Sequence, residues 1–124
     1  MLITNAKLYL EEQTLENAYV EIEGEKIISF GDMKYAPESS EIIDARGMHV
    51  MPGFIDQHIH GANGADHMDA TVEANRVVAK FLPTEGTTSF LATTMTQSVE
   101  NVDAALTAIA RAIEENKAGE AEIL

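Results

Sequence analysis

The sequence lacks cysteine and has few basic residues, and both features narrow what the chain can do. Without cysteine it forms neither a disulfide framework nor a thiolate metal site, so a bound metal must be held by histidine, aspartate or glutamate. Only 8 lysines and arginines stand against 21 acidic residues, which gives a formal charge of −13. Because this charge repels phosphate backbones and anionic lipid surfaces, we predict no nucleic-acid partner and no membrane partner.

Long hydrophobic runs are also missing. No stretch approaches the roughly 20 apolar residues that span a bilayer, and the start MLITNAKLYL has no basic leader of the signal-peptide kind. We therefore expect a cytoplasmic protein. The 124 residues, 45% of them hydrophobic, suffice for one ordinary globular domain.

Residues 1–51 show strand patterning and no helical period. The stretch AYVEIEGEKIISF alternates Ala18, Val20 and Ile22 on one face, turns at Gly24 and resumes with further apolar residues, which predicts a hairpin. ITNAKLYL before it and EIIDARGMHVM after it have the composition of further strands. We predict a small β-sandwich-like segment over residues 1–51, with an open sheet as the alternative.

The pattern changes after Pro52 to alternating strands and helices, so residues 52–124 are predicted to be α/β. GFIDQHIH and TTSFLATT have the apolar or β-branched composition of buried strands. TVEANRVVAKFL predicts a first helix capped by Asp69 or Thr71, and residues 98–117 predict a second one capped by Ser98. The predicted apolar stripes are Val77, Val78, Phe81 and Leu82 in the first helix, and Val99, Val102, Leu106, Ile109 and Ile113 in the second.

This order predicts parallel strands joined by right-handed helical crossovers. Two such units make only a quarter of an eight-fold barrel of ~250 residues, and EIL at residues 122–124 begins a third apolar element. We therefore expect residues 52–124 to be the first two βα units of a truncated (β/α)8 barrel. Uncovered strand edges promote association, and we expect a homo-oligomer.

Two histidines stand one residue apart in PGFIDQHIHG, at the end of the first predicted strand of this part. Because side chains alternate along a strand, His58 and His60 project from the same face and can chelate a divalent cation. Gly61 follows at once, which lets the backbone leave the strand and gives a ligand close approach. An isolated His-x-His is more often structural than metal-binding, but this context favours a metal.

Several neighbours are candidates for supporting roles. Asp56 lies on the same strand face and either orients an imidazole or has a structural role. His67 is expected to be an exposed loop residue rather than a ligand, and His49 to be structural. Thr94, with Thr93 and Thr96, ends the second strand of this part and is a candidate pocket residue.

The stretch PGFIDQHIHG after a strand-rich segment resembles the opening of the amidohydrolase superfamily, metal-dependent hydrolases built on a (β/α)8 barrel with an appended β-sandwich. HGANGADHMDA and LPTEGTTSFLATTMTQ are similar to the branch that deacetylates N-acetylglucosamine 6-phosphate. The resemblance implies hydrolysis of this amino-sugar phosphate to glucosamine 6-phosphate and acetate.

It also implies that His58 and His60 bind one divalent metal, zinc, iron or another, of a binuclear site. The catalytic aspartate and the remaining ligands are expected beyond Leu124, so the chain alone is expected to be inactive.

Two alternatives stay open. Another amidohydrolase, such as a dihydroorotase or an aminoacylase, shares the histidine pair, although GANGAD follows the pair where the cyclic-amide branch usually has an arginine. A non-catalytic module with a vestigial metal site is the other alternative.

Overall fold

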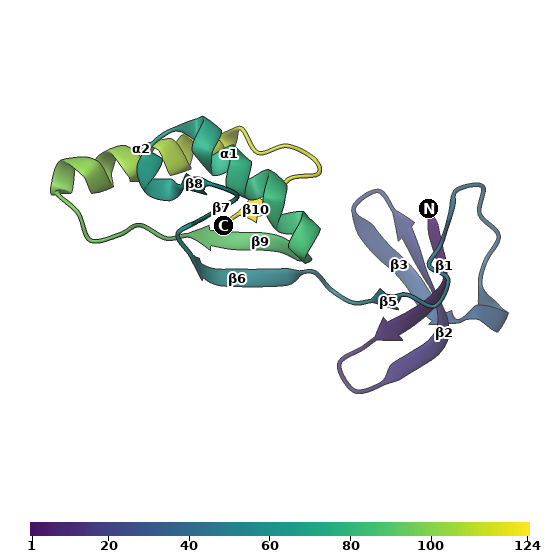
Figure 1. The fold of residues 1–124 in the computed structure, drawn as a ribbon. Coiled ribbons are helices and arrows are strands. Elements are labelled where there is room, and N and C mark those ends of the chain that lie inside the picture. The colour runs from purple at the N-terminus through teal and green to yellow at the C-terminus, as the bar shows by residue number, and fades with distance from the viewer. The chain divides into compact units, whose positions relative to one another are not determined.

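A computed structural model describes all 124 residues, which divide into two compact units, Met1–Pro52 and Gly53–Leu124. The first unit contains five strands, and the second contains both strands and helices (Figure 1). Neither α-helix is long and apolar enough to cross a lipid membrane.

The first unit is one five-stranded sheet. Its strand order is β3-β2-β1-β4, with β5 also paired to β1; β1 pairs antiparallel with β2 and parallel with β4 and β5. A short 3₁₀ turn, η1, follows β3. The elements are β1 (Leu2–Tyr9), β2 (Thr14–Glu23), β3 (Lys26–Asp32), η1 (Met33–Tyr35), β4 (Ile42–Asp44) and β5 (His49–Val50).

The predicted hairpin is confirmed as β2 and β3. It turns at Gly24, whose φ of 59° lies in the left-handed region that glycine adopts without steric cost. Ala18 and Val20 are buried and Ile22 is partly buried, as the alternation indicated. The strands make a single layer here, and β3 leaves Ile27 and Phe30 exposed.

The second unit contains a three-stranded parallel sheet of order β10-β9-β6. Both α-helices lie on one side of this sheet (Figure 1). A two-stranded hairpin, β7 and β8, follows the first strand. The elements are β6 (Phe54–Ile59), β7 (Gly61–Ala62), β8 (Ala65–Asp66), η2 (His67–Asp69), α1 (Val72–Phe81), η3 (Leu82–Glu85), β9 (Thr87–Ala92), α2 (Val99–Glu114) and β10 (Glu122–Ile123).

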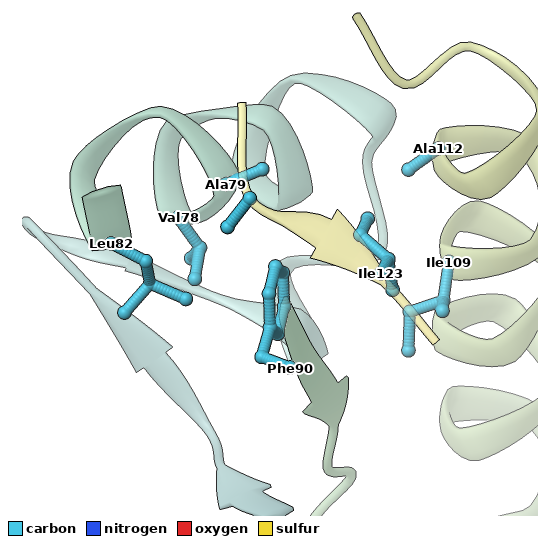
Figure 2. Close-up of a cluster of buried hydrophobic side chains, with 8 residues drawn as sticks. Val78, Ala79, Leu82, Phe90, Ile109, Ala112 and Ile123 are labelled. Atoms are coloured by element: carbon cyan, nitrogen blue, oxygen red, sulfur yellow. The ribbon is translucent and has the colours of Figure 1, made fainter. Parts of the chain in front are cut away.

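The core of this unit surrounds Phe90 on the middle strand. Figure 2 shows Phe90 between Val78 and Leu82 of the first helix region and Ile109 and Ile123 farther along the chain. These side chains are at most 7% exposed. The helices are therefore held to the sheet by apolar burial, at roughly 25 cal/mol per Å² of surface removed from water.

The helix caps follow the predicted chemistry. Thr71 caps α1 by accepting a hydrogen bond from the Ala74 N–H at 3.1 Å, and Ser98 caps α2 in the same way with Asn101. Asp69, the other candidate cap, instead closes a reciprocal pair of hydrogen bonds with Asp66 around η2.

The predicted apolar stripe of α2 is wrong in part. Val99 is 81% exposed and Leu106 is 51% exposed, whereas Ala105, Ala108 and Ala112 are buried beside Ile109. Small side chains let a helix approach its neighbour closely, so the alanine face packs inward. Among the described residues no element covers the face carrying the larger side chains. On α1 the buried stripe is likewise shifted, to Ala74, Asn75, Val78, Ala79 and Leu82.

The prediction of fully buried strands is also wrong in part. In β6, Phe54 is 58% exposed and Ile55 is 60% exposed, and Leu91 of β9 is 42% exposed. Both helices cover the same side of the sheet (Figure 1), so the other side has no helix of this unit over it.

An ion pair fastens α1 to the segment that precedes β10. The Arg76 guanidinium donates to Glu120 Oε1 at 3.0 and 3.3 Å, and the main-chain N–H of Lys117 donates to Oε2 at 3.0 Å. The Glu120 side chain is only 4% exposed. Burial alone raises the pKa of Glu120, but the hydrogen bonds from Arg76 and Lys117 together with nearby positive charge outweigh it and hold the pKa below 4.5.

We expect Glu120→Gln to destabilise the chain by about 2 kcal/mol at neutral pH, because an amide cannot accept from both groups of donors. A carboxyl whose pKa is lowered by folding stabilises the folded state above its unfolded pKa, and this contribution disappears as pH falls through the folded pKa. Urea unfolding should therefore show a wild-type advantage that is full above about pH 5 and shrinks below pH 4.5. An advantage independent of pH would contradict the charged role of Glu120.

Candidate metal centre

His58 and His60 lie together at the carboxyl end of β6. Their ring centroids are 5.0 Å apart, and the rings meet edge to face at 89°. The His58 side chain is exposed and that of His60 is partly buried. Two imidazoles at this spacing, held at the end of a rigid strand, can both bind one metal ion.

Thr93, the residue directly after β9, fixes the ring of His60. Its Nδ1 atom lies 3.0 Å from the Thr93 carbonyl oxygen, and the Thr93 N–H donates to the Ile59 carbonyl at 3.0 Å. Because a carbonyl only accepts, Nδ1 must carry a proton, and in the neutral ring Nε2 then has the lone pair. A neutral imidazole held in this tautomer is the form that binds a metal.

Asp56 supports the main chain of the pair. Its Oδ1 atom accepts a hydrogen bond from the His58 N–H at 3.0 Å. This carboxylate oxygen therefore bonds to the backbone N–H of His58, one of the two candidate ligands. Of the two roles that the sequence left open, this contact is the structural one.

Gly61 and Thr94, the two other candidate residues, differ in their surroundings. A Cβ on Gly61 would overlap the Ala65 carbonyl oxygen and lie 2.8 Å from the Asp66 Cα. The atoms that approach this glycine closely are therefore those of β8. Thr94 is partly buried, but Thr93 is the threonine that contacts His60.

His67 is not the exposed loop residue that was predicted. Its side chain is fully buried, and its ring stacks on Phe90 with centroids 5.8 Å apart. Its Nδ1 atom lies 2.7 Å from Oδ1 of Asn75, another fully buried residue. The sequence feature that could have indicated this contact is Asn75, a polar residue among the buried residues of a helix.

The residues present fit part of a metal centre. His58 and His60 supply two nitrogen donors, and no group of three or more histidine, cysteine, aspartate or glutamate side chains in the chain is placed to hold a metal. A four-coordinate site therefore needs further ligands from elsewhere.

Comparisons with known proteins place these features in a family. Residues 41–118 match the model described as the amidohydrolase family. N-acetylglucosamine-6-phosphate deacetylase of Bacillus subtilis is 41% identical over 107 residues, which cover 86% of this chain and 27% of that protein. The enzyme of the same name from Vibrio furnissii is 34% identical, over 91% of this chain and 28% of that protein.

A solved structure agrees with the sequence relatives. The crystal structure of N-acetylglucosamine-6-phosphate deacetylase from Pasteurella multocida superposes with a TM-score of 0.85 and is 25% identical; the match covers 94% of this chain and 31% of that one. The chain thus spans less than a third of the length of these relatives. The family model covers well over half of the chain, including both histidines, and the chain therefore belongs to the amidohydrolase family.

Proposed function

We propose that this chain is the amino-terminal part of a metal-dependent deacetylase acting on N-acetylglucosamine 6-phosphate, releasing glucosamine 6-phosphate and acetate. The observation that carries the proposal is the His58–His60 pair, with the His60 tautomer set by Thr93. The names of the two sequence relatives and of the Pasteurella multocida structure support the substrate.

The fold of the whole protein is part of the proposal. The parallel sheet with both helices on one side supports the proposal that residues 52–124 are the first two βα units of a (β/α)8 barrel. Residues 1–51 would then belong to the appended β-sandwich. We propose that the whole protein is a cytoplasmic homo-oligomer, in which the edges of β6 and β10 left unpaired within this chain would pair with further strands of the closed barrel.

In this proposal His58 and His60 bind one divalent ion of a binuclear site. When bound, the metal supplies Lewis acidity, which activates water at neutral pH and polarises the acetamide carbonyl. The Thr93 carbonyl holds His60 in its Nδ1–H tautomer, and the Asp56 carboxylate holds the backbone of His58. The exposed His58 ring leaves this end of the strand accessible to a small substrate.

The chain does not by itself complete the reaction in this proposal. With a net charge of −13 it has few cationic side chains for a sugar phosphate, and two histidines are half of a four-ligand set. The catalytic aspartate, which accepts the proton of the attacking water and returns it to the leaving amine, is assigned to the portion beyond Leu124.

The test is acetate release from N-acetylglucosamine 6-phosphate by the whole protein. We expect His58→Ala with His60→Ala to lower kcat/KM by a hundredfold or more, about 2.7 kcal/mol of barrier. His49→Ala is the control, because His49 lies in the first unit, with its ring beside Tyr9. Full turnover in the double variant, or an equal loss in the control, would reject this site.

A further inference from the structure

His67 is a fully buried histidine that the proposed chemistry does not use. Its Nε2 atom is buried without a hydrogen-bond partner, and its ring lies nearly parallel to that of Phe90, at 18°. An unpaired buried polar atom is a free-energy cost that an apolar ring of the same size would avoid. Packing alone therefore does not explain a histidine at this position.

The hydrogen bonds around Asn75 fix the state of this ring. The Asn75 amide nitrogen donates to the Thr71 carbonyl oxygen at 2.9 Å, and a carbonyl oxygen can only accept. Oδ1 of Asn75 must therefore face His67, whose Nδ1 atom, 2.7 Å away, is the donor. The bond joins η2 to α1.

The main chain of His67 reaches the candidate metal centre. Its N–H donates to the His60 carbonyl oxygen at 2.8 Å. His60 is consequently held from two sides, its carbonyl by His67 and its ring by Thr93. The His67 side chain is in turn fixed against Asn75 and Phe90.

We propose that His67 is a positioning residue for His60, an inference that rests on the proposed metal site. The His67–Asn75 hydrogen bond keeps η2 against α1 and so keeps the His67 N–H on the His60 carbonyl. This contact holds the His60 imidazole where its Nδ1–H meets Thr93 and its Nε2 lone pair stays free. The buried, unpaired Nε2 of His67 is then a by-product of using a ring that donates from Nδ1 alone.

Three variants of the chain separate positioning from stability. His67→Phe keeps a ring against Phe90 and removes the donor to Asn75. His67→Asn keeps a donor close to the position of Nδ1 and removes the ring. Val78→Ala opens a cavity in the same core, which contains Phe90, without touching either hydrogen bond.

The first readout is the tautomer of His60 in the metal-free chain, measured by the nitrogen shifts of the imidazole in NMR. We expect a dominant Nδ1–H tautomer in the wild type, His67→Asn and Val78→Ala, and a mixture of both tautomers in His67→Phe. The second readout is Zn²⁺ affinity, which should fall about tenfold in His67→Phe and stay within about twofold of wild type in the other two variants.

In thermal unfolding, His67→Asn should have a lower melting temperature than His67→Phe, because it lacks the ring. The less stable variant, His67→Asn, should therefore be the one that binds Zn²⁺ more tightly. Unchanged tautomer and affinity in His67→Phe would overturn the proposal, as would equal losses in Val78→Ala. If His67→Phe does not fold, Asn75→Ala, which removes the acceptor, is judged by the same criteria. A wild type that binds no Zn²⁺ but shows the expected tautomer pattern would reject the metal site and support the positioning role.

Discussion

Alanine at both His58 and His60 is expected to lower the affinity of the chain for Zn²⁺ on the order of a hundredfold or more. The two rings, 5.0 Å apart at one strand end, are the paired nitrogen donors of the chain, and the Thr93 carbonyl keeps the lone pair of His60 available. Titration of the metal-free chain with Zn²⁺, followed by calorimetry, measures the loss. Because only neutral imidazole binds a metal, wild-type affinity should also weaken on acidification.

His49→Ala is the matched control for this titration. It also removes one histidine, but from the exposed side of β5 in the other unit, and it should leave Zn²⁺ affinity unchanged. Zn²⁺ binding of wild-type strength in the double variant would show that groups other than His58 and His60 bind the metal.

Phe90→Ala is expected to destabilise residues 53–124 by about 3 to 5 kcal/mol, the range for removing a buried aromatic ring. Phe90 is fully buried among side chains from both helices and from β10 (Figure 2). Its ring also stacks on that of His67. Its loss leaves a cavity that these elements together must close.

The helices and the tyrosines lie in different units, so the stability of each unit can be followed separately in Phe90→Ala. Both α-helices lie in the second unit and all three tyrosines, Tyr9, Tyr19 and Tyr35, lie in the first. Unfolding followed by far-ultraviolet circular dichroism should shift to lower denaturant in Phe90→Ala, whereas the tyrosine fluorescence transition should not. Leu91→Ala, at the adjacent 42% exposed position, is the control and should cost less than about 1 kcal/mol.

Local patterns in the sequence predicted the elements of this fold well. The hairpin turning at Gly24, the caps at Thr71 and Ser98, and the strand–helix alternation after Pro52 all depend on neighbouring residues, and all are confirmed. The faces of these elements were predicted less well. Which side of α2 packs inward depends on the alanines that meet the rest of the unit, and hydrophobicity alone favoured the wrong side chains.

The candidate site was predicted where it depended on strand geometry and missed where it depended on contacts between distant segments. Alternation in a strand put His58 and His60 on one face, and their rings lie together. The Thr93 carbonyl bonds to a residue 33 positions earlier in the chain, and His67 bonds to Asn75 across the start of a helix. A main-chain carbonyl carries no signal in a residue pattern, and the signal of Asn75, a polar residue within a helical stripe, does not name its partner, so neither contact was foreseen.

The strand pairings of this protein differ in how soon they can form along a growing or refolding chain. The β2–β3 hairpin pairs Glu23 with Lys26, so its first contacts close a loop of a few residues. In the second unit every pairing of the parallel sheet waits for a helix: Phe54 pairs with Thr87 and Ser89 with Glu122. Closing longer loops costs more entropy before any contact offsets it, which slows folding. The hairpin should therefore acquire protection from hydrogen exchange before the sheet that carries His58 and His60, and the candidate metal centre forms later than the hairpin.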